Sequence, residues 1–279
     1  MVLEQNNSNN GKKLDFFQLY TVFLEIDSVE SLTLGRNRSL IKSFYHFYYF
    51  ESMIKKSSGD DNIRDKLNQT KILLKKEFKN YMSQKNKYHI KIWANPQTSS
   101  TYPHIVENPN ISEAFLYLVD AVEQYEKWRS KLSNEQLLVI YRKNLEDRQK
   151  YYGNDECFKG FNEELLKNID ITKLTNNKML KQTLIEFHNA ISHLVAAYYG
   201  RNQDNNKERA INHFKRGALD SYKAIIKDFY HLYNVKKAKN DPPSEDMKNI
   251  RKKEYLNIGS DETIFKEYKK FTDSLIANI

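Results

Sequence analysis

The strongest constraint on the fold is a helical repeat of apolar side chains between positions 184 and 198. The apolar residues are Leu184, Phe187, Ile191, Leu194 and Tyr198. Their steps of 3, 4, 3 and 4 residues match one face of an amphipathic α-helix. A second stripe of this period follows the polar loop 200–206, within residues 207–235. Its members are Ile211, Phe214, Ala218, Tyr222, Ile225, Phe229 and Leu232. Because a short loop makes consecutive helices antiparallel neighbours, we expect a helical bundle built around this pair.

The rest of the chain also favours an all-α fold. Its 279 residues include 8 Gly and 5 Pro, fewer turn formers than an all-β or doubly wound sheet fold needs. The sequence predicts further helices at residues 14–24, 63–84, 111–131, 134–152, 163–168, 245–255 and 261–277. Ser133 and Gln136 have the spacing of a capping box, which predicts the start of the helix at 134–152.

One segment, residues 86–110, interrupts the helical pattern. Tyr88, Ile90 and Ile92 alternate with polar residues, as in a short β-strand. Several prolines follow and prevent a long helix there. We therefore predict an N-terminal helical region at residues 1–110 and a helical bundle at residues 111–279. A long functional loop at 86–110 fits the same pattern.

Charge and cysteine content narrow the classes of partner and compartment. The formal net charge is +9, from 45 Lys and Arg against 36 Asp and Glu, which permits binding to nucleic acid or acidic partners. The single cysteine, Cys157, excludes an intrachain disulfide and a zinc site of several cysteines. No signal-peptide pattern opens the chain, and no segment has the roughly 20 apolar residues of a membrane span. We expect a cytoplasmic protein that does not contact a membrane.

Common catalytic and nucleotide-binding motifs are missing from the sequence. It contains no Walker loop, no Gly-x-Gly-x-x-Gly, no His-Glu-x-x-His and no Gly-x-Ser-x-Gly. The acidic neighbours of Cys157 disfavour a thiolate nucleophile. We therefore predict no cofactor and no metal.

The first long helix has a second face that carries polar side chains followed by small residues. The run His188-Asn189-x-x-x-His193 on this helix resembles the signature of the HEPN superfamily, a group of small helical domains. Many of its members are ribonucleases of bacterial defence and toxin systems. The signature is an Arg, usually followed by Asn, His or Asp, and then a His further along the helix. Asn189 and His193 match it, whereas His188 stands in place of the Arg. The resemblance covers residues 176–237, under a quarter of the chain.

The resemblance implies a metal-independent ribonuclease in which the ribose 2′-hydroxyl attacks the neighbouring phosphate. His193 is then the general acid or base, because an imidazole can exchange protons near neutral pH. Asn189 is the polar helper that orients the phosphate. His188 takes the catalytic position of the Arg, and it needs a neighbouring carboxylate to stay charged. Such sites are often shared by two protomers, so the resemblance also implies a homodimer.

The second long helix offers cations that could replace the missing Arg. Arg209, His213 and Arg216 follow one another along its polar face. In an antiparallel pair these residues would face Glu186 and His193 of the first helix. We therefore expect Arg209, His213 and Arg216 to bind RNA, in a protein of a bacterial defence or toxin–antitoxin type system.

Other interpretations of the same residues remain open. His188 and His193 could be packed histidines at a helix interface. A metal site from His188, His193 and His213 is disfavoured, because positions 188 and 193 lie about 140° apart on a helix. Aromatic and basic residues interleave at 36–55, which fits base stacking or a buried helix built from rings. The alternative function is a non-enzymatic helical adaptor that binds a protein partner, for example within a defence complex.

Overall fold

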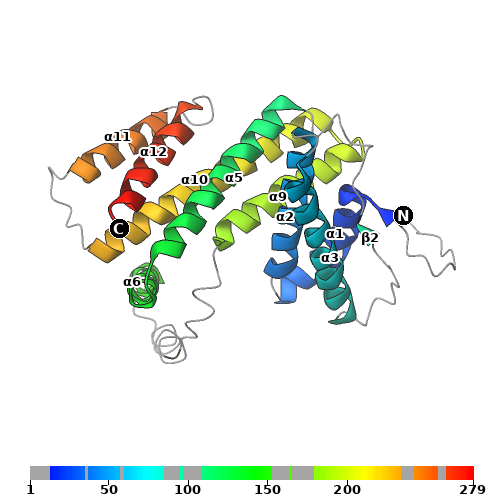
Figure 1. Cartoon of the computed structure of the whole chain (residues 1–279), viewed down its shortest axis with the longest axis horizontal. Coiled ribbons are helices and arrows are strands. Elements are labelled where there is room, and N and C mark those ends of the chain that lie inside the picture. The colour runs from blue at the N-terminus through cyan, green and yellow to red at the C-terminus, as the bar shows by residue number, and fades with distance from the viewer. Residues whose placement is uncertain are drawn as a thin grey trace. The chain divides into compact units, whose positions relative to one another are not determined.

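The protein is described by a computed structural model, and its fold is all-α (Figure 1). The described residues are 13–34, 37–56, 60–84, 95–96, 108–152, 164, 179–233, 242–256 and 262–279. The helices among them are α1 (Phe16–Leu34), α2 (Arg38–Lys56), α3 (Asp61–Gln84), α5 (Pro109–Lys131), α6 (Asn134–Tyr152), α9 (Lys181–Tyr198), α10 (Gln203–Tyr233), α11 (Pro242–Leu256) and α12 (Thr263–Ala277). The predicted all-α class is confirmed.

Extended structure in the described residues is confined to one short pairing. Strand β1 (Lys13–Leu14) runs parallel to strand β2 (Asn95–Pro96). Three features of the sequence analysis lie outside the described residues: the strand predicted at Tyr88–Ile92, the single cysteine Cys157, and the helix predicted at 163–168, of which only residue 164 is described.

The chain divides into two compact units, and each combines two segments of sequence. Unit 1 comprises residues 1–114 and 184–213, and unit 2 comprises residues 115–183 and 214–279. The segment 184–213, which carries His188, Asn189 and His193, groups with residues 1–114 in unit 1.

Aromatic rings fill the core of unit 1. Phe16 of α1 stacks on Phe47 of α2 with ring centroids 5.8 Å apart, and Tyr20 meets Phe44 edge-on at 4.7 Å. Phe187 brings α9 into the same core. These rings are fully buried, so on α2 they replace the leucines of an ordinary helical core and have no face open to a base.

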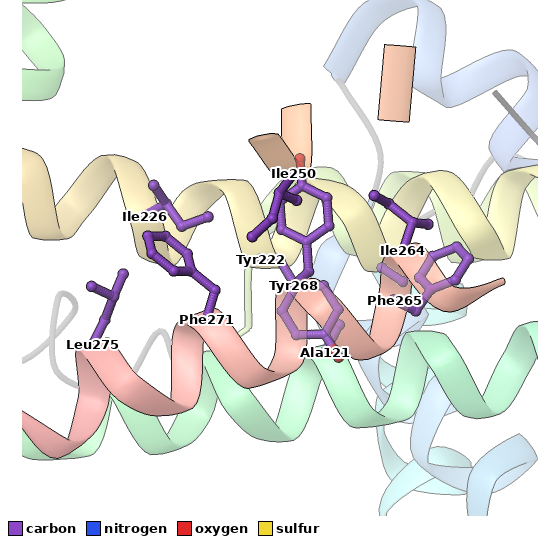
Figure 2. Close-up of a cluster of buried hydrophobic side chains, with 10 residues drawn as sticks. Ala121, Tyr222, Ile226, Ile250, Ile264, Phe265, Tyr268, Phe271 and Leu275 are labelled. Carbon is purple, nitrogen blue, oxygen red and sulfur yellow. The ribbon is translucent and has the colours of Figure 1, made fainter. Parts of the chain in front are cut away.

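The C-terminal helix α12 forms the centre of one core cluster in unit 2. Its buried side chains, Phe265 and Phe271 among them, pack with Tyr222 and Ile226 of α10, as Figure 2 shows. Ile250 of α11 belongs to the same cluster. A second cluster surrounds Trp128 of α5, which is fully buried. Burial at this scale is the main contribution that holds the short helices α11 and α12 in place.

The start of α6 confirms the predicted capping box. The Gln136 backbone N–H donates to Ser133 Oγ at 3.2 Å, and the Ser133 N–H donates to Gln136 Oε1 at 2.8 Å. Among the described helices, none combines the length and the apolar content required to cross a bilayer.

Candidate functional site

The turn between α9 and α10 determines which residues of the two helices meet. Helix α9 ends in a Schellman motif, in which the Gly200 N–H donates to the Ala197 carbonyl and the Arg201 N–H donates to the Ala196 carbonyl. Gly200 has φ +77°, a conformation that costs little only in glycine. Helix α10 then begins at Gln203, four residues before the predicted start at Lys207. The turn is therefore short, and the two helices run back along each other.

His193 is held by a side chain from the first turn of α10. Its Nδ1 lies 2.9 Å from Asn206 Oδ1. The amide of Asn206 is itself oriented, because its Nδ2 donates to the Arg201 carbonyl at 2.7 Å. The oxygen of Asn206 therefore faces His193, and Nδ1 of His193 carries the proton that it donates to that oxygen. Nε2 is the nitrogen of His193 that is left for other partners.

His213 is held by a carboxylate from α9. Its Nδ1 donates to Glu186 Oε2 at 2.6 Å. The Glu186 side chain is 5% exposed and the His213 side chain 20%, so the carboxylate lies inside and the ring reaches the surface. A carboxylate on Nδ1 orients an imidazole and stabilises a positive charge on it. Nε2 is again the remaining nitrogen.

The two rings form a pair. The centroids of His193 and His213 are 5.3 Å apart, and the ring planes make an angle of 17°. Both rings are partly exposed. Among the described residues, the Nε2 atoms of His193 and His213 have no hydrogen-bond partner. We call His193, His213, Glu186 and Asn206 the histidine pair and its two anchors.

His188 is in a different environment from His193, although both lie on α9. It is buried at 5% exposure, and its Nδ1 lies 2.9 Å from the Tyr20 hydroxyl of α1. The rings of Tyr20 and Phe23 lie beside it, at centroid distances of 6.0 and 5.8 Å. The structure therefore places His188 in the aromatic core of unit 1, away from the histidine pair. Asn189 is partly buried and lies one turn before His193 on α9.

The two predicted arginines differ in their relation to the histidine pair. Arg209 is exposed and lies one turn before His213 on α10, within unit 1. Arg216 is also exposed, but it belongs to unit 2. Of the predicted RNA-binding residues, His213 thus contacts His193, and Arg209 lies one helical turn from His213.

The sequence prediction missed Asn206 and the direct bond between Glu186 and His213. A signal for both exists in the spacing. Glu186 and His193 are separated by two helical turns on α9, and Asn206 and His213 are separated by two turns on α10. In an antiparallel pair of helices, residues with this spacing lie opposite each other. Glu186 therefore contacts His213, and Asn206 contacts His193.

The histidine pair is suited to proton transfer. In the part of the chain that the structure describes, no three His, Cys, Asp or Glu side chains gather as a metal site. Two imidazoles with oriented rings, each with an Nε2 atom that has no hydrogen-bond partner among the described residues, can accept and donate protons. A comparison of the chain with protein-family models, curated proteins and solved structures finds no match.

Proposed function

We propose that unit 1 carries an RNA-binding, metal-independent ribonuclease site of the HEPN-like kind, with His193 as a proton-transfer residue. The observation that carries this proposal is the fixed ring of His193, whose Nδ1 donates to Asn206 while Nε2 has no partner among the described residues. A general base needs an accessible lone pair on a ring of known orientation. The formal charge of +9 and the exposed Arg209 favour an anionic substrate.

The chemistry would be transfer of the phosphate within the RNA strand. His193 Nε2 removes the proton from a ribose 2′-hydroxyl, and the 2′-oxygen forms a bond to the adjacent phosphorus. The bond from phosphorus to the 5′-oxygen breaks, and that oxygen leaves with a proton. The products are a 2′,3′-cyclic phosphate and a 5′-hydroxyl end. Asn189, on the same side of α9 as His193, would orient the phosphate.

The biological setting of the proposal comes from the resemblance. A bacterial defence or toxin–antitoxin type system would place the protein in the cytoplasm, with RNA as substrate. A homodimer and a protein partner of a defence complex belong to the same proposal. His188 enters it as a core residue, because its Nδ1 is used by Tyr20.

RNA cleavage by the full chain tests the proposal. Purified protein would be incubated with transfer RNA and single-stranded RNA in EDTA, beside His193→Gln and a control, His231→Gln. His231 is also on α10 but pairs with Asp147 in unit 2. We expect wild type and the control to cleave, and His193→Gln to lose at least about 100-fold. Equal cleavage by His193→Gln would refute its role, and wild type that binds RNA without cleaving it would refute the ribonuclease activity.

Binding of a protein partner is a second candidate function. Tyr255 and Leu256, at the end of α11, are 77% and 67% exposed, which is high for large apolar side chains. A non-enzymatic adaptor could use them as contacts. In that case Tyr255→Ser with Leu256→Ser would lose the biological activity, and His193→Gln would keep it.

A further inference from the structure

The side chains that bind Nδ1 of His193 and of His213 differ in charge, and this difference indicates different catalytic roles for the two rings. We infer that His213, held by Glu186, is the second catalytic residue and the general acid that protonates the leaving 5′-oxygen. The inference deepens the proposed ribonuclease function and rests on it. The residue would act through Nε2, the ring nitrogen that has no partner among the described residues.

The first step of the argument is the anchor of each ring. Nδ1 of His213 donates to a carboxylate, that of Glu186, at 2.6 Å. Nδ1 of His193 donates to a neutral amide oxygen, that of Asn206, at 2.9 Å. A buried carboxylate stabilises the imidazolium form of the ring bound to it, whereas an amide oxygen supplies no net charge. The two anchors therefore assign the general-acid role to His213 and the general-base role to His193.

The second step is the distance between the rings. With centroids 5.3 Å apart and planes nearly parallel, both rings can lie beside a single phosphate group. The rings are thus close enough to contact the same small group. In the inferred mechanism one ring serves the attacking oxygen of a phosphate and the other serves its leaving oxygen.

The third step is the balance of protons. Neutral His193 accepts the proton of the 2′-hydroxyl as the bond from the 2′-oxygen to phosphorus forms. Protonated His213 gives its Nε2 proton to the 5′-oxygen as the bond from phosphorus to that oxygen breaks. After the step His193 is protonated and His213 is neutral, and exchange with water restores both.

A pair of substrates distinguishes a general acid from a residue that only supports the fold. RNA has an alkoxide leaving group that needs a proton, whereas uridine 3′-(4-nitrophenyl phosphate) releases a stable nitrophenolate that does not. We expect His213→Gln to lose at least about 100-fold on RNA and less than about 10-fold on the aryl ester. His193→Gln should lose similar factors on both substrates, because the 2′-hydroxyl must be deprotonated in each.

Two further variants complete the experiment. Glu186→Gln keeps an acceptor for Nδ1 but removes the charge, and we expect a loss on RNA that is smaller than that of His213→Gln. Asn212→Ala, an exposed neighbour of His213 on α10, is the matched control and should keep full activity on both substrates. Each variant is checked for folding by its circular dichroism spectrum and thermal transition before its activity is compared.

The possible results separate this inference from the proposed function. Equal losses of His213→Gln on RNA and on the aryl ester, or no loss on RNA, would overturn the general-acid role while the ribonuclease stands. Wild type that cleaves neither substrate would overturn the ribonuclease itself. Nitrogen-15 NMR of the His213 ring gives a readout that does not depend on turnover. The inference requires a proton on Nδ1, and a ring protonated on Nε2 alone would refute it.

Discussion

Two clusters of charged and polar side chains, one in each unit, differ in how many of their polar atoms form hydrogen bonds. In unit 2 the Glu254 carboxylate accepts from Lys223 Nζ at 2.5 Å on one oxygen. Its other oxygen accepts from Arg251 Nη1 at 2.6 Å and from the Tyr268 hydroxyl at 2.5 Å. In unit 1 the rings of His193 and His213 each bind one anchor and keep a nitrogen without a partner among the described residues.

The pKa values in the Glu254 cluster reflect these hydrogen bonds. Burial raises the pKa of Glu254, but the hydrogen bonds from Lys223 and Tyr268 outweigh this effect and hold the pKa below its usual range. Burial, together with the bond to Glu254, raises the pKa of Tyr268. A group that is kept in one protonation state across the physiological range contributes to structure and is a poor proton carrier. The two clusters therefore differ in whether a polar group keeps an atom available for a further hydrogen bond.

The largest expected effect comes from His188, a buried residue on the same helix as His193. His188→Ala should reduce the local stability of α1 and α9 by about 2–4 kcal/mol, because it opens a cavity in an aromatic core and leaves Tyr20 without that bond. His193→Ala should cost about 1 kcal/mol, since the ring is partly exposed. Hydrogen exchange of the α9 amides measures both. Equal effects would remove the distinction between packed and open histidines.

Glu254 provides the corresponding test in unit 2. Glu254→Ala should reduce the stability of α11 and α12 by about 2 kcal/mol, because Lys223, Arg251 and Tyr268 lose a shared acceptor. The control is Asp246→Ala, an exposed acid on the same helix, with an expected change within about 0.5 kcal/mol. Hydrogen exchange of α12 gives the two values. A Glu254 variant as stable as its control would show that the cluster contributes nothing to the fold.

A buried acid in unit 2 offers a test through pH. Burial raises the pKa of Asp228 from 3.8 to about 6, and the charge of Arg129 offsets part of this effect. The folded state thus holds the proton more tightly than the unfolded state. The unfolding free energy should therefore fall as the pH rises from about 4 to about 6, by up to about 3 kcal/mol for this group.

Asp228→Asn removes this titration. The variant should gain stability relative to wild type as the pH rises through that window, and the gain should stay constant above it. The difference in thermal midpoint between variant and wild type, measured at several pH values, checks this, with the exposed Asp246→Asn as control. A difference that does not change with pH would show that Asp228 titrates normally in the folded protein.

The smallest effect on stability is expected at the exposed capping box of Ser133 and Gln136. Ser133→Ala removes one half of the capping box of α6 and should cost about 1 kcal/mol. Ser130→Ala, whose hydroxyl only bonds back to the Lys127 carbonyl of its own helix, should be nearly neutral. Thermal unfolding of both variants gives the comparison. If the two serines had the same effect, the capping bond would have no energetic role.

Apolar spacing was sufficient to predict the class of fold and most of the helices. The stripe that begins at Leu184 and the capping box at Ser133 are local signals, and the structure shows both. The start of α10 was placed too late because its first turn is polar and looks like a loop. Asp204 in that turn is, however, favourable at a helix N-terminus.

The candidate site was predictable only in part, because its partners are distant in the sequence. The pairing of His188 with Tyr20 joins residues 168 positions apart, and no local pattern reveals it. The motif placed His188 and His193 together, whereas packing separates them by burying one. The contacts of Glu186 and Asn206 depend on which residues of α9 lie opposite which residues of α10. The predicted loop did not determine this alignment, because it placed the start of α10 one helical turn too late. The grouping of 184–213 with the N-terminal helices depends on tertiary packing and has no sequence signature.

The orientation of His193 ultimately depends on the main chain. Asn206 faces the ring because its amide group is held by the carbonyl of residue 201, and every amino acid has the same carbonyl. Position 201 can therefore vary among homologous chains without changing the ring, whereas position 206 needs a side chain that accepts and donates at once. Homologues that retain this chemistry should keep Asn at 206 and Gly at 200 and differ freely at 201.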